Sequence, residues 1–107
     1  MPLEEYTRVL TALVEKTRPL VKGLILATPY VIESNRADPM RRRMDEYGAV
    51  VRDLAVRNNA VFIDTQAAFD AVLVHTHPMT LAWDRIHPNT TGHMILARAF
   101  LAALGAA

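Results

Sequence analysis

The fold is decided by the stretch Gly23-Leu24-Ile25-Leu26-Ala27-Thr28, which Pro29 closes. A continuous apolar run between a glycine and a proline is typical of a strand that a parallel sheet buries on both faces. A second run, Ala60-Val61-Phe62-Ile63, ends in the same manner at Asp64. We therefore expect two short buried strands, each leading into a loop or helix start that carries polar side chains.

Helical patterns flank both strands. Residues 3–17 place apolar side chains at spacings of three and four, and Pro19 marks the expected end of this helix. Asp38 followed by Pro39 predicts a helix start, with the aspartate as N-cap. This second helix should reach about Asn58. Its expected buried stripe is Met40, Met44, Tyr47, Val51, Leu54 and Ala55.

The remainder of the chain predicts two more helices. One covers residues 65–74, and a loop with two prolines follows it. The other begins after Asn89, a good N-cap, and ends at Gly105. The expected buried stripe of this last helix is Leu96, Ala97, Phe100, Leu101 and Leu104.

Alternation of strands and helices indicates an α/β architecture with parallel strands flanked by helices. A sheet normally has about 4–6 strands, and only two are predicted here. We therefore expect residues 1–107 to form a single partial domain in which the strand at residues 24–27 has an open edge. Open strand edges and exposed apolar faces favour association, so we expect a homo-oligomer.

The composition excludes several classes of protein. The chain has 107 residues, with 12 basic and 11 acidic side chains and a formal net charge of +1. A balance so close to neutral argues against nucleic acid or an anionic membrane as partner. Cysteine is absent, which excludes disulfides, thiol catalysis and Cys-based metal sites. No leader-like or membrane-spanning run is evident, so we expect a cytoplasmic protein.

The stretch that suggests chemistry is Trp83-Asp84-Arg85-Ile86-His87-Pro88-Asn89. An aspartate three residues before a histidine, in a loop that leads into a helix, can place its carboxylate on the imidazole Nδ1–H. The other ring nitrogen, Nε2, is then available as a general base. Spacing alone leaves a second interpretation open, in which Asp84 only caps a turn and His87 packs beside it.

This block, with Gly92-His93 and an Ala/Leu-rich helix after it, resembles the last conserved block of the SGNH, or GDSL-type, hydrolases. It is most similar to their acetylxylan-esterase-like branch. The resemblance implies a flavodoxin-like three-layer α/β/α fold, of which this chain matches the C-terminal half. It extends over nearly the whole chain, because further segments of that branch occur in the same order: residues 19–23, 28–30, 38–42, 64–69 and 82–85.

The resemblance also implies an activity for the complete enzyme, namely carboxylic ester hydrolysis by a Ser-His-Asp triad. His87 would be the general base and Asp84 its orienting carboxylate, with an acylated carbohydrate such as acetylated xylan, or another small ester, as substrate. No metal or organic cofactor is implied. The family takes its nucleophile and oxyanion donors from earlier blocks that this sequence lacks. The single serine, Ser34, has no small neighbours that would permit a nucleophile turn.

We therefore expect the chain alone to be a poor esterase. The alternative from another class is a non-catalytic α/β interaction module that oligomerises through its open strand edge.

The remaining candidates have a structural and a functional interpretation each. Trp83 could line an acyl or sugar pocket or lie in the core. Asp64 could meet a ligand at the sheet edge, although we favour an N-cap. The run Arg41–Arg43 could bind phosphate, although we favour a solvated helix face. The four histidines, with His75 and His77 as a possible ligand pair, could suggest a metal site, but we favour solvated loop histidines and expect no metal. For His93, in the first turn of the last helix, we favour packing or capping over catalysis.

Overall fold

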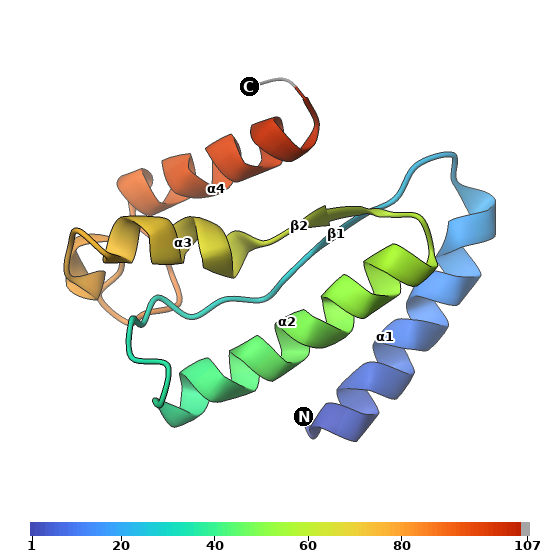
Figure 1. Cartoon of the computed structure of the whole chain (residues 1–107), viewed down its shortest axis with the longest axis horizontal. Helices are drawn as coiled ribbons and strands as arrows, with labels where there is room; N and C mark the ends of the chain where they lie inside the picture. The colour runs from blue at the N-terminus through green and yellow to red at the C-terminus, as the bar shows by residue number, and fades with distance from the viewer. Residues whose placement is uncertain (106–107) are drawn as a thin grey trace.

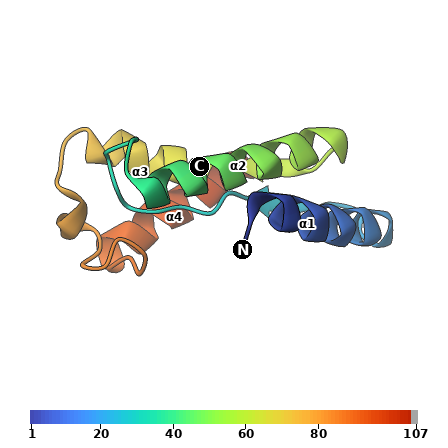
Figure 2. The same cartoon turned by 90° about the horizontal axis from the view of Figure 1, so that it is seen from below.

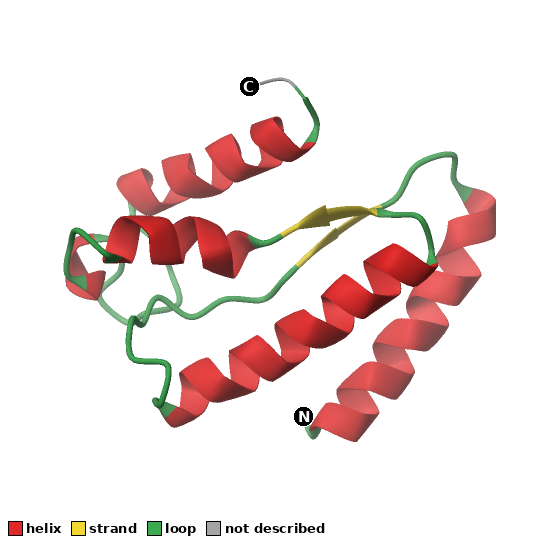
Figure 3. Ribbon diagram, in the orientation of Figure 1, coloured by secondary structure: helices red, strands yellow, loops and turns green. Residues whose placement is uncertain are grey.

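The computed structural model describes residues 1–105 and confirms the predicted order of helices and strands. Figure 1 shows this order, and Figure 3 separates the helices and strands by colour. The elements are α1 (Leu3–Thr17), the 3₁₀ turn η1 (Arg18–Leu20), β1 (Ile25–Ala27), α2 (Pro39–Arg57), β2 (Val61–Ile63), α3 (Thr65–Leu73), the 3₁₀ turn η2 (Pro78–Thr80) and α4 (Thr90–Ala103).

The two strands pair in parallel, with Ile25 opposite Val61 and Ala27 opposite Ile63. The helix α2 forms the crossover between them and contacts both strands. Because the two strands run in the same direction, both end at the same edge of the sheet. That edge leads into the loop after β1 and into α3, and both segments pack against the loop before α4 that holds the candidate site.

Side-chain caps begin three of the helices. Asp38 accepts hydrogen bonds from the backbone N–H groups of Met40 and Arg41, and Asn89 accepts one from Gly92. Both predicted N-caps are therefore confirmed. Asp64 caps α3 by accepting from the Ala67 N–H, which confirms the interpretation that we favoured for it. These contacts are local, and residue type alone was sufficient to predict them.

The principal hydrophobic cluster consists of Ile32, Phe69, Leu73, Leu81 and Ala82. It joins three segments that are far apart in sequence: the loop after β1, the helix α3 and the loop before α4. Two of its members, Leu81 and Ala82, directly precede the loop that contains Asp84 and His87, so the cluster anchors the start of that loop. A separate contact, the stacking of Tyr6 on Tyr47 with ring centroids 4.2 Å apart, joins α1 to α2.

The expectation that both strands are buried on both faces is wrong. Ile25 is 42% exposed and its cross-strand partner Val61 is 38% exposed. The helix α2 packs against both strands, whereas α4 packs against α3 and, of the two strands, chiefly against β2. Within residues 1–105 no other element covers this part of the sheet. Figure 2 shows the consequence, a flat molecule whose shortest dimension is 18 Å.

The predicted stripe of α4 is also less buried than expected. Leu96 packs against the main hydrophobic cluster, but Ala97, Phe100, Leu101 and Leu104 are exposed. The helical spacing of these apolar residues was predicted correctly, but no other element of residues 1–105 packs over this face of α4. Met40 is likewise exposed, at the start of α2. None of the helices in residues 1–105 is long and apolar enough to cross a membrane.

Candidate active site

The loop between η2 and α4 holds the candidate site, and one backbone hydrogen bond and one close approach hold its base together. The Asn89 N–H donates to the Leu81 carbonyl at 2.7 Å, and Leu81 is buried in the main cluster. A Cβ atom added at Gly92 would lie 2.4 Å from the Pro88 Cβ. Only glycine therefore allows the first turn of α4 to approach the loop so closely. The loop is thus anchored at both ends, and residues 83–88 lie between these anchors.

Asp84 and His87 meet within this loop. The Asp84 Oδ2 lies 2.5 Å from the His87 Nδ1, and Oδ1 accepts the backbone N–H groups of Ile86 at 3.0 Å and His87 at 2.8 Å. The carboxylate thus both caps the turn and contacts the ring. These hydrogen bonds, first the backbone and then the ring contact with His87, hold the pKa of Asp84 well below its usual range. Asp84 is therefore an anion at neutral pH.

The pair faces an open cavity of about 420 Å³, lined by Ala82, Trp83, Asp84, His87 and Asn89. The side chains of His87 and Asp84 are 84% and 52% exposed. Trp83 is 89% exposed, so its interpretation as a core residue is wrong. Within residues 1–105, no group hydrogen-bonds to the His87 Nε2. That nitrogen can therefore accept a proton from a molecule in the cavity.

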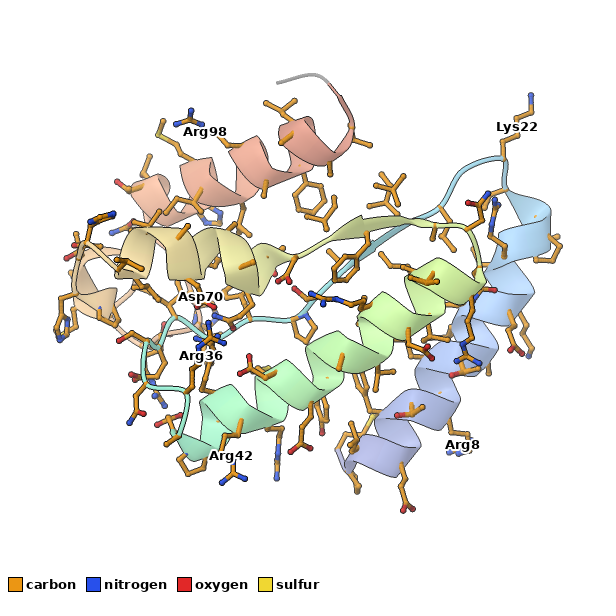
Figure 4. All side chains as sticks on the ribbon, in the orientation of Figure 1. Arg8, Lys22, Arg36, Arg42, Asp70 and Arg98 are labelled. Atoms are coloured by element: carbon orange, nitrogen blue, oxygen red, sulfur yellow. The ribbon has the colours of Figure 1, made fainter. Side chains whose placement is uncertain are left out.

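A second polar cluster corrects the interpretation of the arginine run. Arg42 and Arg43 are exposed as expected, but Arg41 is only 1% exposed. Its guanidinium donates to both carboxylate oxygens of Asp70, at 2.8 and 2.6 Å, and to Asp45 at 2.9 Å. Figure 4 shows Asp70 beside Arg36, with which it also pairs, whereas Arg42 points away from the molecule. Arg41 is buried because its position on α2 faces α3.

Sequence reasoning also missed three residues that fix the loop after β1, one by joining it to α3 and two by joining it to the loop of the site. Gln66 bonds to both backbone groups of Val31, through Oε1 at 2.9 Å and Nε2 at 3.0 Å. The Tyr30 hydroxyl donates to the Ile86 carbonyl at 3.1 Å. Arg85 pairs with Glu33 across 52 residues of sequence. No sequence signal could have shown these partners, because each contact joins segments that only the fold brings together.

The other candidates lie apart from the Asp84–His87 pair. Ser34 is exposed in the loop between β1 and α2, and no hydrogen bond in residues 1–105 joins it to His87. The His77 Nδ1 accepts the Met79 N–H at 3.1 Å, which caps η2. His75 and His93 are exposed. In the described part of the chain, no three side chains of His, Asp or Glu are grouped as metal ligands would be.

Comparison with known proteins identifies the family of the chain. The model of the GDSL-like Lipase/Acylhydrolase family matches residues 1–95. The chain belongs to this family. The fold class predicted from the sequence, the C-terminal half of an SGNH hydrolase α/β fold, is confirmed by the solved structures that the chain matches.

Two similar proteins illustrate this match. An acetylxylan esterase from Geobacillus stearothermophilus is 58% identical over 103 residues, which are 96% of this chain and 47% of that protein. Its crystal structure superposes with a TM-score of 0.96 over 97% of this chain and 48% of that one. An α/β hydrolase enzyme from the metagenome of Lake Arreo, 55% identical, gives a TM-score of 0.97 over 99% of this chain and 49% of its own. The chain thus spans about half the length of these relatives.

Catalytic mutants of the Geobacillus esterase have also been solved. Alanine replaces a serine early in its sequence in one, an aspartate in another, and in a third a histidine three positions after that aspartate. A further mutant replaces the tryptophan directly before the same aspartate.

Proposed function

We propose that this chain supplies the acid–base half of a serine carboxylic ester hydrolase. The observation that carries the proposal is the contact of 2.5 Å between the Asp84 carboxylate and the His87 Nδ1 beside an open cavity. In this geometry Asp84 holds the ring in the tautomer with its proton on Nδ1, and Nε2 is left as the base. The spacing of the aspartate and histidine in the relative's catalytic mutants supports these roles.

The reaction is a two-step acyl transfer. A serine hydroxyl attacks the ester carbonyl while His87 accepts its proton, and His87 then protonates the departing alcohol. In the second step His87 takes a proton from water, which attacks the acyl-enzyme, and returns that proton to the serine. Asp84 stays ionised throughout and stabilises the imidazolium that forms twice in each cycle.

An acetylated carbohydrate is the substrate class that we infer. The 58% identity to an acetylxylan esterase supports this inference. Trp83 supports it as well, because its exposed indole lines the cavity beside Asp84 and His87 and offers an apolar face on which a sugar ring can stack. We assign Trp83 to substrate binding and not to the chemical step.

The nucleophile and the oxyanion donors are the parts that these 107 residues do not supply. No hydrogen bond joins Ser34 to His87 in residues 1–105, and the serine of the relative's catalytic mutant lies early in a protein that is about twice as long. Losing a single oxyanion donor costs about 10²–10³ in rate. We infer that the isolated chain is a very poor esterase and that activity requires the other half of the domain.

A chimera tests this function. Residues 1–107 would be joined to the half of the Geobacillus esterase that they do not match, and deacetylation of acetylated xylo-oligosaccharides would be followed by acetate release. We expect His87→Ala in the chimera to lower kcat by about 10³–10⁴. The matched control is His93→Ala, which removes another exposed histidine. The isolated chain should hydrolyse p-nitrophenyl acetate no faster than its own His87→Ala variant.

Two results would contradict the proposal. The first is a chimera whose kcat is unchanged by His87→Ala. The second is turnover by the isolated chain that a serine-directed phosphonate abolishes, since Ser34 would then be a nucleophile.

The exposed strand face favours a second role for the chain, self-association. Ile25 and Val61 leave apolar surface on the sheet, and β1 is paired only with β2 among the described residues. Exposed apolar surface and unpaired strand edges both promote association, and two-fold symmetry is its commonest form. We expect light scattering of the dilute chain to give a dimer or larger species, and Ile25→Lys to shift it toward monomer. A cooperatively folded monomer at micromolar concentration would refute this role.

A further inference from the structure

Arg85 lies between Asp84 and His87 and has an unusual backbone. Its φ angle is +69°, in the left-handed region that side chains with a Cβ rarely adopt. In residues 1–105 the only other non-glycine residue with positive φ is Asn59, a residue type that tolerates this conformation. An arginine has no such tolerance, so other contacts must hold it in place.

Backbone contacts hold the turn from one side. The Ile32 N–H donates to the Arg85 carbonyl at 2.8 Å, and Ile32 is completely buried in the main hydrophobic cluster. The next carbonyl, that of Ile86, accepts the Tyr30 hydroxyl. The Tyr30 ring packs against buried Phe69 with centroids 4.8 Å apart. Both carbonyls of the turn are therefore fixed by residues of the loop after β1.

Ion pairs hold the turn through the side chain. The Arg85 Nη1 donates to the Glu33 Oε1 at 2.9 Å and to the Asp38 Oδ1 at 3.2 Å. Asp38 is also the N-cap of α2, so the guanidinium ties the turn to the start of the longest helix. The contact with Arg85 is also the largest cause that lowers the pKa of Glu33. Glu33 and Asp38 are thus anions under conditions in which Arg85 is a cation.

Packing cannot position the Asp84–His87 pair, because both side chains are largely exposed. Their contact depends on the turn of the backbone at Arg85, which brings the Asp84 carboxylate over the N–H groups of Ile86 and His87. We propose that Arg85 is a positioning residue that keeps the Asp84 carboxylate on the His87 Nδ1 by clamping this turn to Glu33 and Asp38. The role rests on the function proposed for the pair, and Arg85 itself need not touch the substrate.

Nuclear magnetic resonance of the 107-residue chain tests the clamp. Histidine ring nitrogens labelled with ¹⁵N report which nitrogen carries the proton, at a pH at which the rings are neutral. We expect His87 to hold its proton on Nδ1 in the unmodified chain. Arg85→Ala should lower the ratio of the Nδ1–H to the Nε2–H tautomer by about fivefold, the effect of losing two partly exposed ion pairs. Arg85→Lys should restore part of the ratio.

The matched control is Arg52→Ala. It removes an ion pair with Asp64 at 3.1 Å that lies outside the loop of the site, and it should leave the His87 ratio unchanged. Glu33→Gln, which weakens one side of the clamp without altering the turn, should give a smaller decrease than Arg85→Ala. If circular dichroism shows that Arg85→Ala does not fold, Glu33→Gln provides the test of the clamp.

The outcomes separate the two proposals. If the unmodified chain carries the His87 proton on Nε2, the Asp84–His87 pair fails and the clamp fails with it. If the pair is present but Arg85→Ala and Glu33→Gln both keep the full ratio, only the clamp is overturned. A decrease in these variants but not in Arg52→Ala supports it.

Discussion

Two pairs of side chains differ in what holds them together, Arg41 with Asp70 and Asp84 with His87. Arg41 with Asp70 is enclosed between α2 and α3, where the guanidinium also binds Asp45 and the Glu33 carbonyl. Asp84 with His87 is open to solvent and lies within one turn of four residues. The first pair is held by long-range contacts of its own side chains, and the second by the backbone turn between its two members.

This difference separates stability from chemistry. When a buried pair loses one partner, the remaining charge has little access to water, so the loss weakens the whole fold. An exposed pair that loses one partner leaves a solvated group, so its loss affects chiefly the orientation and proton affinity of the remaining partner. The exposed pair is open to the cavity because it contributes little to the core.

Arg41→Ala should have the largest effect on folding. It removes the guanidinium from Asp70 and from the Glu33 carbonyl, and we expect a loss of about 3 kcal/mol in the free energy of unfolding. Urea denaturation measures this loss. The double variant Arg41→Met with Asp70→Leu should lose less, because neither charge is then buried alone. A single variant as stable as the unmodified chain would show that the buried pair is no more structural than the exposed one.

Gly92→Ala should have an intermediate effect, exerted through the backbone below the exposed pair. The new Cβ would lie 2.4 Å from the Pro88 Cβ, so α4 and the loop must separate. We expect a loss of about 2 kcal/mol in the free energy of unfolding and a changed His87 resonance. The control is Gly48→Ala in α2, where the nearest atom would be the Thr28 Cγ2 at 3.5 Å, an ordinary contact. This control should be neutral or stabilising by up to about 1 kcal/mol.

The smallest expected effect is a loss of stability of the folded chain at acid pH. Because the pKa of Asp84 is lowered in the folded chain, its contribution to stability is complete above the ordinary aspartate value, about 3.9, and is lost as the pH falls below it. The ¹³C shift of the Asp84 carboxyl should titrate at lower pH in the folded chain than in urea.

In His87→Ala the midpoint of this titration should rise only part of the way to the value in urea. The ring contact is then gone, but the backbone N–H groups that donate to Asp84 remain. An unchanged midpoint would mean that the carboxylate only caps the turn.

Much of the site could be predicted because its decisive contacts are short in sequence. Asp84 and His87 are three residues apart, and Asn89 caps the helix that follows directly. The partners of Arg41 and Arg85 could not be predicted in this manner. Asp70 lies 29 residues from Arg41, and Glu33 lies 52 residues from Arg85. Charge and residue type identify possible partners but cannot choose among them.

The sequence by itself determined the order of the helices and strands, three N-caps and the spacing of the Asp84–His87 pair. These features depend on hydrogen bonds and side-chain periods that span a few residues. Only the tertiary structure decided that Arg41 is buried, that Trp83 is exposed, that one face of the sheet is open and that Arg85 spans two loops. Each of these depends on which surfaces meet, and a run of residues has no burial until another element packs against it.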